Sequence, residues 1–439
     1  MRPIVAIVGR PNVGKSTLFN KLVGKRISIV EDSPGVTRDR IYAEVEWLNK
    51  YFTLIDTGGI EPKSDEIIWS KMRQQAELAM ETAHVILFLV DAKNGLTPQD
   101  REIAVMLRKT KKPLILVVNK VDNRDIPANF YDFYELGLGE PQPISGVNGL
   151  GIGDLLDEIA VHFPENLDME YQEDVTKVAI VGKPNAGKSS ILNRILGEER
   201  VIVSPIAGTT RDAIDTYKEI AGNKYLFIDT AGLRRKSRVD ENIERYSAIR
   251  AYTAIERADV VLMVIDANDG ISEQDSKIAG MAHDAGKCIV VVVNKWDLIE
   301  KDNDSIKKYT KQISEELPFM MYAPIIFIST LTGQRFGQIR EKIDYVLEQA
   351  SRRVPTGLLN DVIGEAVMLN QPPSDKGKRL KVYYATQVGV RPPTFTIFVN
   401  SNELFHFSYQ RYLENKIREN FGFEGTPLVV KRREKGDKR

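Results

Sequence analysis

The residues best suited to chemistry form a glycine-rich segment that occurs twice, as GRPNVGKS at 9–16 and as GKPNAGKS at 182–189. Both copies match the pattern GxxxxGKS, follow a short apolar run and precede a helix-like run. Glycines let such a loop turn around an oxyanion, so that its amides and the following helix N-terminus face phosphate groups. The lysine then reaches the β- and γ-phosphates, and the serine places a hydroxyl on Mg²⁺. The pattern predicts two phosphate loops, formed by Gly9, Arg10, Pro11, Asn12, Val13, Gly14, Lys15 and Ser16 and by Gly182, Lys183, Pro184, Asn185, Ala186, Gly187, Lys188 and Ser189.

A second motif, DxxG, follows each loop as DTGGI at 56–60 and as DTAGL at 229–233. Its carboxylate can hold Mg²⁺, and its glycine amide can approach a γ-phosphate because no side chain intervenes. A threonine in GVTRD and GTTRD lies between loop and motif, where it either closes over the metal or is an ordinary turn residue. The expected Mg²⁺ ligands are Ser16, Thr37, Asp56, Ser189, Thr210 and Asp229. The expected catalytic residues are Lys15, Thr37, Gly59, Lys188, Thr210 and Gly232, and the same motifs add Thr57, Gly58, Ile60, Thr230, Ala231 and Leu233 as nucleotide contacts.

A third motif, NKxD, occurs at 119–122 and 294–297 after apolar runs. Its carboxylate can accept hydrogen bonds from the N1–H and the exocyclic amine of guanine, whereas adenine offers no matching pair of donors. Each charge-assisted bond contributes roughly 1.5–3 kcal/mol, so the aspartate discriminates between the two bases. The motif predicts GTP and GDP as ligands. The base-side residues are Asn119, Lys120, Asp122 and Ser145 in the first copy and Asn294, Lys295, Asp297 and Ser329 in the second.

The motifs recur because a whole domain is duplicated. The offset between copies is 173 residues for the first two motifs, 175 for NKxD and 184 for the final serine, so the second copy has gained nine residues late in the unit. The first copy predicts strands at 4–8, 52–55, 85–90 and 114–118 alternating with helices at 16–22, 69–81 and 100–108. This alternation predicts an α/β fold, with a mainly parallel sheet, helices on both faces, and ligands at the carboxyl ends of the strands.

The same patterns predict the domain borders: a first GTPase domain at 1–163, an acidic linker at 164–174 and a second GTPase domain at 175–351. A small α/β domain is expected at 356–439. It carries 14 Lys and Arg against 9 Asp and Glu and ends in a basic tail, although the whole chain has 61 of each sign. Its expected helices are 358–369 and 408–420, and its expected strands are 379–387, 394–399 and 427–431.

The ordered motifs are similar to those of the translation-factor-related GTPases. Two tandem copies and a C-terminal domain resemble one family in particular, the Der/EngA ribosome-assembly GTPases, over essentially the whole chain. The resemblance implies two P-loop GTPase domains and a KH-like domain. It also implies a GTP-hydrolysing factor in ribosome biogenesis, which matures the large subunit through nucleotide-dependent binding to rRNA or a pre-subunit.

The residue after DxxG is aliphatic in both copies, Ile60 and Leu233, where Ras-like GTPases have a glutamine that orients the attacking water. Either both domains hydrolyse GTP slowly when alone, or another group assists. Asn12 and Asn185 resemble the asparagine that holds a monovalent cation beside the phosphates in potassium-activated GTPases. They predict K⁺ stimulation, and the alternative is an asparagine that only braces the loop.

Several features bear on RNA. The second copy continues with a basic loop, Arg234, Arg235, Lys236 and Arg238, which either meets RNA phosphate in one nucleotide state or is solvated. GFEG at 422–425 has the letters of the KH GxxG loop, but it should join a helix to a strand, so we do not expect it to clamp RNA. RNA contact would then use Arg379, Lys381, Lys431, Arg432 and Arg433, unless the domain mainly contacts the GTPase domains. We expect Tyr383, Tyr384, Phe395, Phe398, Phe405 and Phe407 in the core rather than as base-stacking platforms.

The composition argues against a disulfide-stabilised protein and against a membrane-spanning one. The single cysteine, Cys288, rules out an internal disulfide framework and is expected as a buried strand thiol. No apolar run approaches the ~18 residues that span a bilayer, so a cytoplasmic protein with no membrane partner is expected. A monomer is expected because two phosphate sites in one chain remove any need for dimerisation. Two other functions stay open: a regulatory switch that recruits proteins in its GTP state, and an RNA-modification GTPase. The lack of a second catalytic constellation counts against the latter.

Overall fold

The computed structural model describes residues 3–24, 42–56, 65–123, 126–163, 175–197, 215–228, 243–300, 304–372, 374–375 and 378–434. The chain forms two compact units, Met1–Glu170 and Tyr171–Arg439. The expected linker at 164–174 lies outside the described residues. So do the residues expected after the phosphate loops: Thr37, Thr57, Gly58, Gly59, Ile60, Thr210, Asp229, Thr230, Ala231, Gly232, Leu233, Arg234, Arg235, Lys236 and Arg238.

The first unit contains a six-stranded sheet in the order β2-β3-β1-β4-β5-β6. All neighbouring strands are parallel except β2 and β3. Its elements are β1 (Ile4–Val8), α1 (Lys15–Val23), β2 (Tyr42–Trp47), β3 (Lys50–Asp56), α2 (Asp65–Thr82), β4 (Val85–Asp91), α3 (Pro98–Leu107), β5 (Leu114–Asn119), η1 (Ala128–Leu136), β6 (Gln142–Pro143) and α4 (Ile152–Val161). The predicted α/β fold is confirmed.

The central strands of this sheet are apolar along their whole length because both faces are covered. Every residue of β1 is buried, as is every residue of β4. One apolar cluster joins α1 and α4 to the sheet, and another joins α2 and α3 to it. The sheet is therefore a rigid support for the loops at its carboxyl edge.

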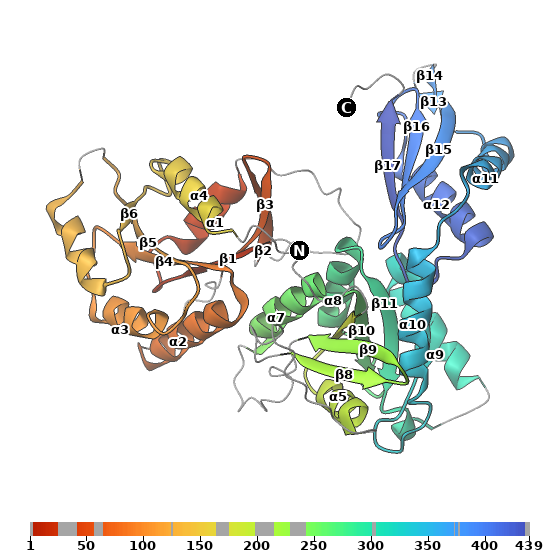
Figure 1. Cartoon of the computed structure of the whole chain (residues 1–439), viewed down its shortest axis with the longest axis horizontal. Coiled ribbons are helices and arrows are strands. Elements are labelled where there is room, and N and C mark those ends of the chain that lie inside the picture. Colours follow the sequence, from red (N-terminus) through yellow and green to blue (C-terminus); the bar gives the residue numbers. More distant parts are fainter. Residues whose placement is uncertain are drawn as a thin grey trace. The chain divides into compact units, whose positions relative to one another are not determined.

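The second unit repeats this order as β12-β11-β10-β7-β9-β8, with only β8 and β9 antiparallel. Figure 1 labels four of these strands, β8, β9, β10 and β11. The repeat comprises β7 (Val175–Val181), α5 (Lys188–Gly197), β8 (Thr216–Ile220), β9 (Asn223–Ile228), α7 (Ile243–Arg257), β10 (Val260–Asp266), α8 (Glu273–Asp284), β11 (Cys288–Asn294), η2 (Trp296–Leu298), α9 (Ser305–Glu316), η3 (Pro318–Met320), β12 (Ile325–Phe327) and α10 (Gln338–Ser351). The nine additional residues fall where η1 of the first unit is replaced by η2, α9 and η3.

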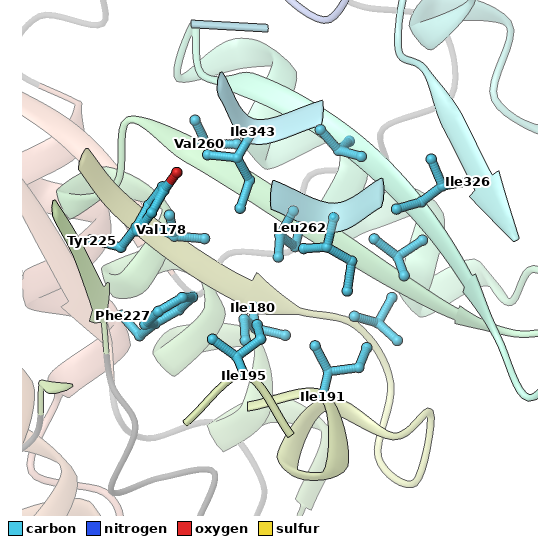
Figure 2. Close-up of a cluster of buried hydrophobic side chains, with 14 of the residues drawn as sticks. Val178, Ile180, Ile191, Ile195, Tyr225, Phe227, Val260, Leu262, Ile326 and Ile343 are labelled. Atoms are coloured by element: carbon cyan, nitrogen blue, oxygen red, sulfur yellow. The ribbon is translucent and has the colours of Figure 1, made fainter. Parts of the chain in front are cut away.

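The core of the second GTPase fold is formed by strands and helices that are far apart in the sequence. Figure 2 shows Tyr225 and Phe227 of β9 beside Val178 of β7, with Ile191 and Ile195 of α5 close by. Cys288 belongs to this cluster, is 4% exposed and donates its thiol to the Val346 carbonyl at 3.6 Å. Burial raises its pKa to about 12, and the predicted buried strand thiol is confirmed.

A three-stranded sheet, β15-β16-β17, and two helices follow in the same unit. The elements are α11 (Thr356–Leu369), β13 (Ser374–Asp375), β14 (Lys378–Arg379), β15 (Val382–Gly389), β16 (Thr394–Val399), α12 (Phe407–Phe421) and β17 (Val429–Glu434). Both helices lie on one side of this sheet (Figure 1). GFEG at 422–425 joins α12 to β17, so the prediction that it links a helix to a strand is confirmed.

Four of the six aromatic residues expected in the core are not buried, and one of these four, Phe398, is half-buried. Tyr383, Tyr384 and Phe407 are 46%, 45% and 47% exposed, whereas Phe395 and Phe405 are buried. A register irregularity between Val382 and Tyr384 interrupts the alternation of faces along β15. Tyr384 stacks on Phe398 at 4.2 Å between ring centroids, so these rings cover the outer face of the sheet.

The C-terminal domain packs against the second GTPase domain. The Ile289 amide of β11 donates to the Gly425 carbonyl at 2.7 Å, and the Gly425 amide donates to the Tyr322 carbonyl at 2.7 Å. The Gln349 side chain of α10 accepts from the Phe423 amide at 3.0 Å. A Cβ on Gly425 would lie 2.2 Å from Val346, so close packing accounts for this glycine.

Candidate nucleotide site

The predicted motif residues gather at one edge of the first sheet. Gly9 follows β1, and Asp56, Asp91 and Asn119 end β3, β4 and β5. These four strands are mutually parallel neighbours, so their carboxyl ends point the same way. Gly9 lies so close to β4 that a Cβ there would be 2.4 Å from the Leu89 carbonyl oxygen. The sheet thus places the phosphate loop directly beside the ends of β3 and β4.

The phosphate loop closes around its own lysine. Gly14 precedes α1 in a left-handed conformation with φ +97°, and the Lys15 ammonium donates to the Gly9 and Arg10 carbonyls at 2.7 and 2.8 Å. Lys15 is 8% exposed. Burial lowers its pKa to about 8, although the Asp56 carboxylate opposes this shift. An anion at the loop would replace the water that this ammonium has lost.

Two of the predicted Mg²⁺ ligands touch one another. The Ser16 hydroxyl donates to an Asp56 carboxylate oxygen at 3.0 Å. A hydroxyl and a carboxylate are hard oxygen donors of the kind that Mg²⁺ prefers, and a nucleotide would add phosphate oxygens. Among the described residues, no group of three or more His, Cys, Asp and Glu could hold a metal without such help. The donors present therefore fit a metal that enters with a nucleotide.

Asn119 joins the phosphate loop to the base side. Its amide donates to the Val13 carbonyl at 2.8 Å, and its side-chain oxygen accepts from the Gly146 amide at 2.9 Å. Both Gly14 and Gly146 lie against this side chain, and a Cβ on Gly14 would be 2.4 Å from its nitrogen. Asn119 is thus a brace between two loops, which an alanine at position 14 would displace.

Lys120 is held by an aspartate that sequence reasoning missed. Its ammonium donates to the Asn12 carbonyl at 2.8 Å and to Asp91 at 2.6 Å. Asp91 is fully buried and also accepts from the Lys93 amide at 2.9 Å. The sequence repeat could have identified this aspartate, because Asp91 recurs as Asp266 at the same 175-residue offset as NKxD.

Asp122 and Ser145 come together at the base side of the first copy. The Ser145 hydroxyl donates to one Asp122 oxygen at 2.8 Å, and the Lys93 ammonium pairs with the other at 2.6 Å. The hydrogen bonds from Lys93 and then Ser145 hold the pKa of Asp122 below its usual range. The carboxylate is therefore ionised and able to accept hydrogen bonds from guanine.

The second copy repeats most of this arrangement. The Lys188 ammonium donates to the Gly182 and Lys183 carbonyls at 2.8 and 2.6 Å, and burial lowers its pKa to about 8. Asn294 donates to the Ala186 carbonyl at 3.0 Å and accepts from the Thr330 hydroxyl at 2.6 Å. Lys295 pairs with Asp266 at 2.6 Å.

The second residue of the phosphate loop is arginine in the first copy and lysine in the second, and the two make different contacts. Arg10 directs its guanidinium to Asp100 at 3.4 Å, whereas Lys183 pairs with Asp269 at 2.8 Å and its amide donates to Asp275 at 3.2 Å. Asp100 and Asp275 are fully buried members of helix capping boxes with Thr97 and Ser272. The repeated patterns TPQD and SEQD would have identified both aspartates as capping residues.

Two models of known protein families match this chain. The model described as "50S ribosome-binding GTPase" matches residues 4–120 and 177–295, and so covers each GTPase fold once. The model described as "KH-domain-like of EngA bacterial GTPase enzymes, C-terminal" matches residues 353–433. The fold and the site thus define a GTP-binding GTPase with tandem P-loop domains and a C-terminal KH-like domain.

Curated relatives narrow the class to one family. GTPase Der of Ruminiclostridium cellulolyticum is 64% identical over 437 residues, and GTPase Der of Alkaliphilus oremlandii is 65% identical over 435 residues, each comparison covering 99% of both chains. The chain belongs to the GTPase Der family. A solved structure described as Era in complex with MgGDPNP and a 16S ribosomal RNA segment is 24% identical and covers 60% of this chain and 93% of that chain, with a TM-score of 0.31.

Proposed function

We propose that the chain hydrolyses GTP at both sites in a Mg²⁺-dependent reaction. The observation that carries this proposal is a constellation found in both copies: a phosphate-loop lysine, buried in the first copy and half-buried in the second, an asparagine that braces the loop, and a base-side aspartate. The loop amides with Lys15 or Lys188 would bind the phosphates, and Asp122 or Asp297 would select guanine. Ser16 with Asp56, and Ser189 with Asp229, would hold Mg²⁺, which supplies neutralising charge on the phosphates. Thr37, Gly59, Thr210 and Gly232 complete the proposed catalytic set.

Because Ile60 and Leu233 cannot orient water, we propose K⁺ as the additional charge, held by Asn12 and Asn185. The expected result is faster turnover in K⁺ than in Na⁺ at equal ionic strength. Asn12→Ala with Asn185→Ala should remove the difference between the two salts without abolishing GDP binding. Equal rates in both salts would contradict a role for K⁺.

We further propose a cytoplasmic role in maturation of the large ribosomal subunit, through nucleotide-dependent binding of this chain, as a monomer, to rRNA or a pre-subunit. The description of the matching GTPase model supports the large subunit. The basic surplus of the C-terminal domain supports RNA contact. Arg379, Lys381, Lys431 and Arg433 are exposed there, whereas Arg432 donates to the Phe405 carbonyl at 3.0 Å.

Co-sedimentation with purified ribosomal subunits tests this role. With a non-hydrolysable GTP analogue we expect binding to the large subunit, and with GDP we expect little. Lys431→Glu with Arg433→Glu should weaken binding and lower its salt dependence. Absence of binding in either nucleotide state would contradict the ribosomal role and leave a regulatory GTPase with protein partners.

A further inference from the structure

The base-selecting aspartates of the two copies have different hydrogen-bond partners. In the first copy, both oxygens of Asp122 have donors, one from the Ser145 hydroxyl and the other from the Lys93 ammonium at 2.6 Å. The Lys93 side chain comes from the loop that follows β4, where its amide is fixed by Asp91 at 2.9 Å. Lys93 thus starts from a fixed point and reaches the carboxylate that guanine needs.

In the second copy an asparagine stands at the position equivalent to Lys93. Asn268 replaces Lys93 at the 175-residue offset, and its side chain turns to Asp269 at 3.3 Å. The Asp297 Oδ1 atom is buried and has no hydrogen-bond partner among the described residues. This carboxylate thus has an oxygen whose hydrogen bond is left for a ligand to make.

We propose that Lys93 competes with guanine for Asp122 and so makes the first site weaker and less selective for the exocyclic amine than the second. This inference rests on the proposed role of Asp122 and Asp297 in base selection. Guanine donates an N1–H and an amine hydrogen to the two carboxylate oxygens, so the ammonium must leave its oxygen or share it. The second site makes the same bonds without displacing an ion pair.

A comparison of GDP with inosine diphosphate measures how much each site depends on the exocyclic amine, separately from its overall affinity for the nucleotide. It retains the N1–H of guanine but lacks the exocyclic amine, so it needs one carboxylate oxygen and leaves the other to Lys93. At the first site, the ion pair between Lys93 and Asp122 therefore partly compensates for the missing amine. At the second site, the loss leaves a carboxylate oxygen unsatisfied, which penalises inosine more strongly.

The test uses the full chain with one site occupied by xanthosine diphosphate. Asp297→Asn should give the second site a preference for xanthine, whose C2 carbonyl accepts a hydrogen bond from an amide, and an excess of that nucleotide then fills it. Titration with GDP and inosine diphosphate reports on the first site. Asp122→Asn isolates the second site in the same way.

In the Asp297→Asn background, Lys93→Asn should tighten GDP binding by about three- to tenfold and increase the preference for GDP over inosine diphosphate by a similar factor. Lys93→Arg keeps a cationic donor and should behave like the parent. In the Asp122→Asn background, Asn268→Lys should change the second site in the opposite direction. Unchanged or weaker GDP binding in Lys93→Asn, or an unchanged preference, would overturn the proposal.

A wrong base-site assignment and an absent competition by Lys93 give different results. If Asp122→Asn and Asp297→Asn leave guanine preferred over xanthine, the assignment of the base site is wrong, and the role of Lys93 falls with it. If both substitutions switch the base and Lys93→Asn has no effect, only the competition by Lys93 is wrong.

Discussion

Gly14 and Gly187 are single residues at which any side chain would disrupt the site. Both adopt a left-handed conformation, with φ +97° and +99°. A Cβ would lie 2.4 Å from the Asn119 nitrogen and 2.1 Å from the Asn294 nitrogen. Each of these asparagines holds a phosphate-loop carbonyl, so backbone strain and loss of the brace would act on the same loop.

Gly14→Ala should weaken GDP binding at the first site by more than about tenfold, because a kcal/mol or two of strain is added and the Asn119 brace is displaced. Gly153→Ala is the matched control. Position 153 lies in α4, where no heavy atom beyond the adjoining helix backbone comes within 4 Å of a new Cβ, so binding should not change. Titration of each full-length variant with fluorescent GDP measures the difference, and comparable losses in both variants would contradict the explanation.

Among the elements, α8 is joined to the second phosphate loop by a buried carboxylate. Asp275 accepts from the Ser272 amide at 3.0 Å and hydroxyl at 2.7 Å, and it also accepts from the Lys183 amide at 3.2 Å. One residue therefore both caps the helix and fixes the loop backbone. The equivalent Asp100 of α3 contacts the side chain of Arg10 instead.

Asp275→Ala should lower the free energy of unfolding by about 1–3 kcal/mol and also weaken nucleotide binding at the second site. Ser272→Ala removes the cap but leaves the Lys183 contact in place. It should lower stability by about 1 kcal/mol and leave binding unchanged. Urea unfolding and GDP titration distinguish the two variants, and equal effects on binding would show that the loop does not depend on Asp275.

The positions of most strands and of the motif loops were predictable from the sequence. The central strands of the first copy, β1 and β4, are buried on both faces, so their apolar runs are easy to recognise, and the doubled motifs identify the loops at their ends. Lys93 was not predictable, because its pairing with Asp122 depends on how two separate loops are placed beside each other. Tyr383 and Tyr384 were wrongly expected in the core, since the irregularity in β15 leaves no trace in the residue pattern.

At the scale of the second unit, an aromatic cluster joins the GTPase fold to the C-terminal domain. His283 of α8 contacts the Tyr322 hydroxyl at 2.8 Å, and Arg418 of α12 lies 4.5 Å from the centroid of the same ring. Arg418 also donates to the Phe423 and Thr426 carbonyls at 2.6 and 2.8 Å. Burial, together with the charges of Arg418 and Arg411, lowers the pKa of His283 to about 4.

The second unit should therefore lose stability in acid. His283 is neutral when folded, but it gains a proton near pH 6.5 when unfolded, so the unfolded state binds more protons between about pH 6.5 and pH 4. Stability should fall by up to about 1.4 kcal/mol per pH unit across this window. His283→Gln should reduce this slope in urea unfolding followed between about pH 7 and pH 5. An unchanged slope would contradict the role of His283.

The bond between Ile289 and Gly425 has a consequence for protein synthesis. The amide belongs to β11 of the second GTPase fold, whereas the carbonyl that accepts from it lies 136 residues later in the chain (425 − 289). Translation proceeds from the N-terminus, and domains generally fold as they emerge. The first unit can fold on the growing chain, but the contact between β11 and Gly425 forms only after the segment around residue 425 has left the translating ribosome. A truncated nascent chain that ends before residue 422 therefore exposes Val346 and Tyr322, which makes it a target for chaperones and proteases.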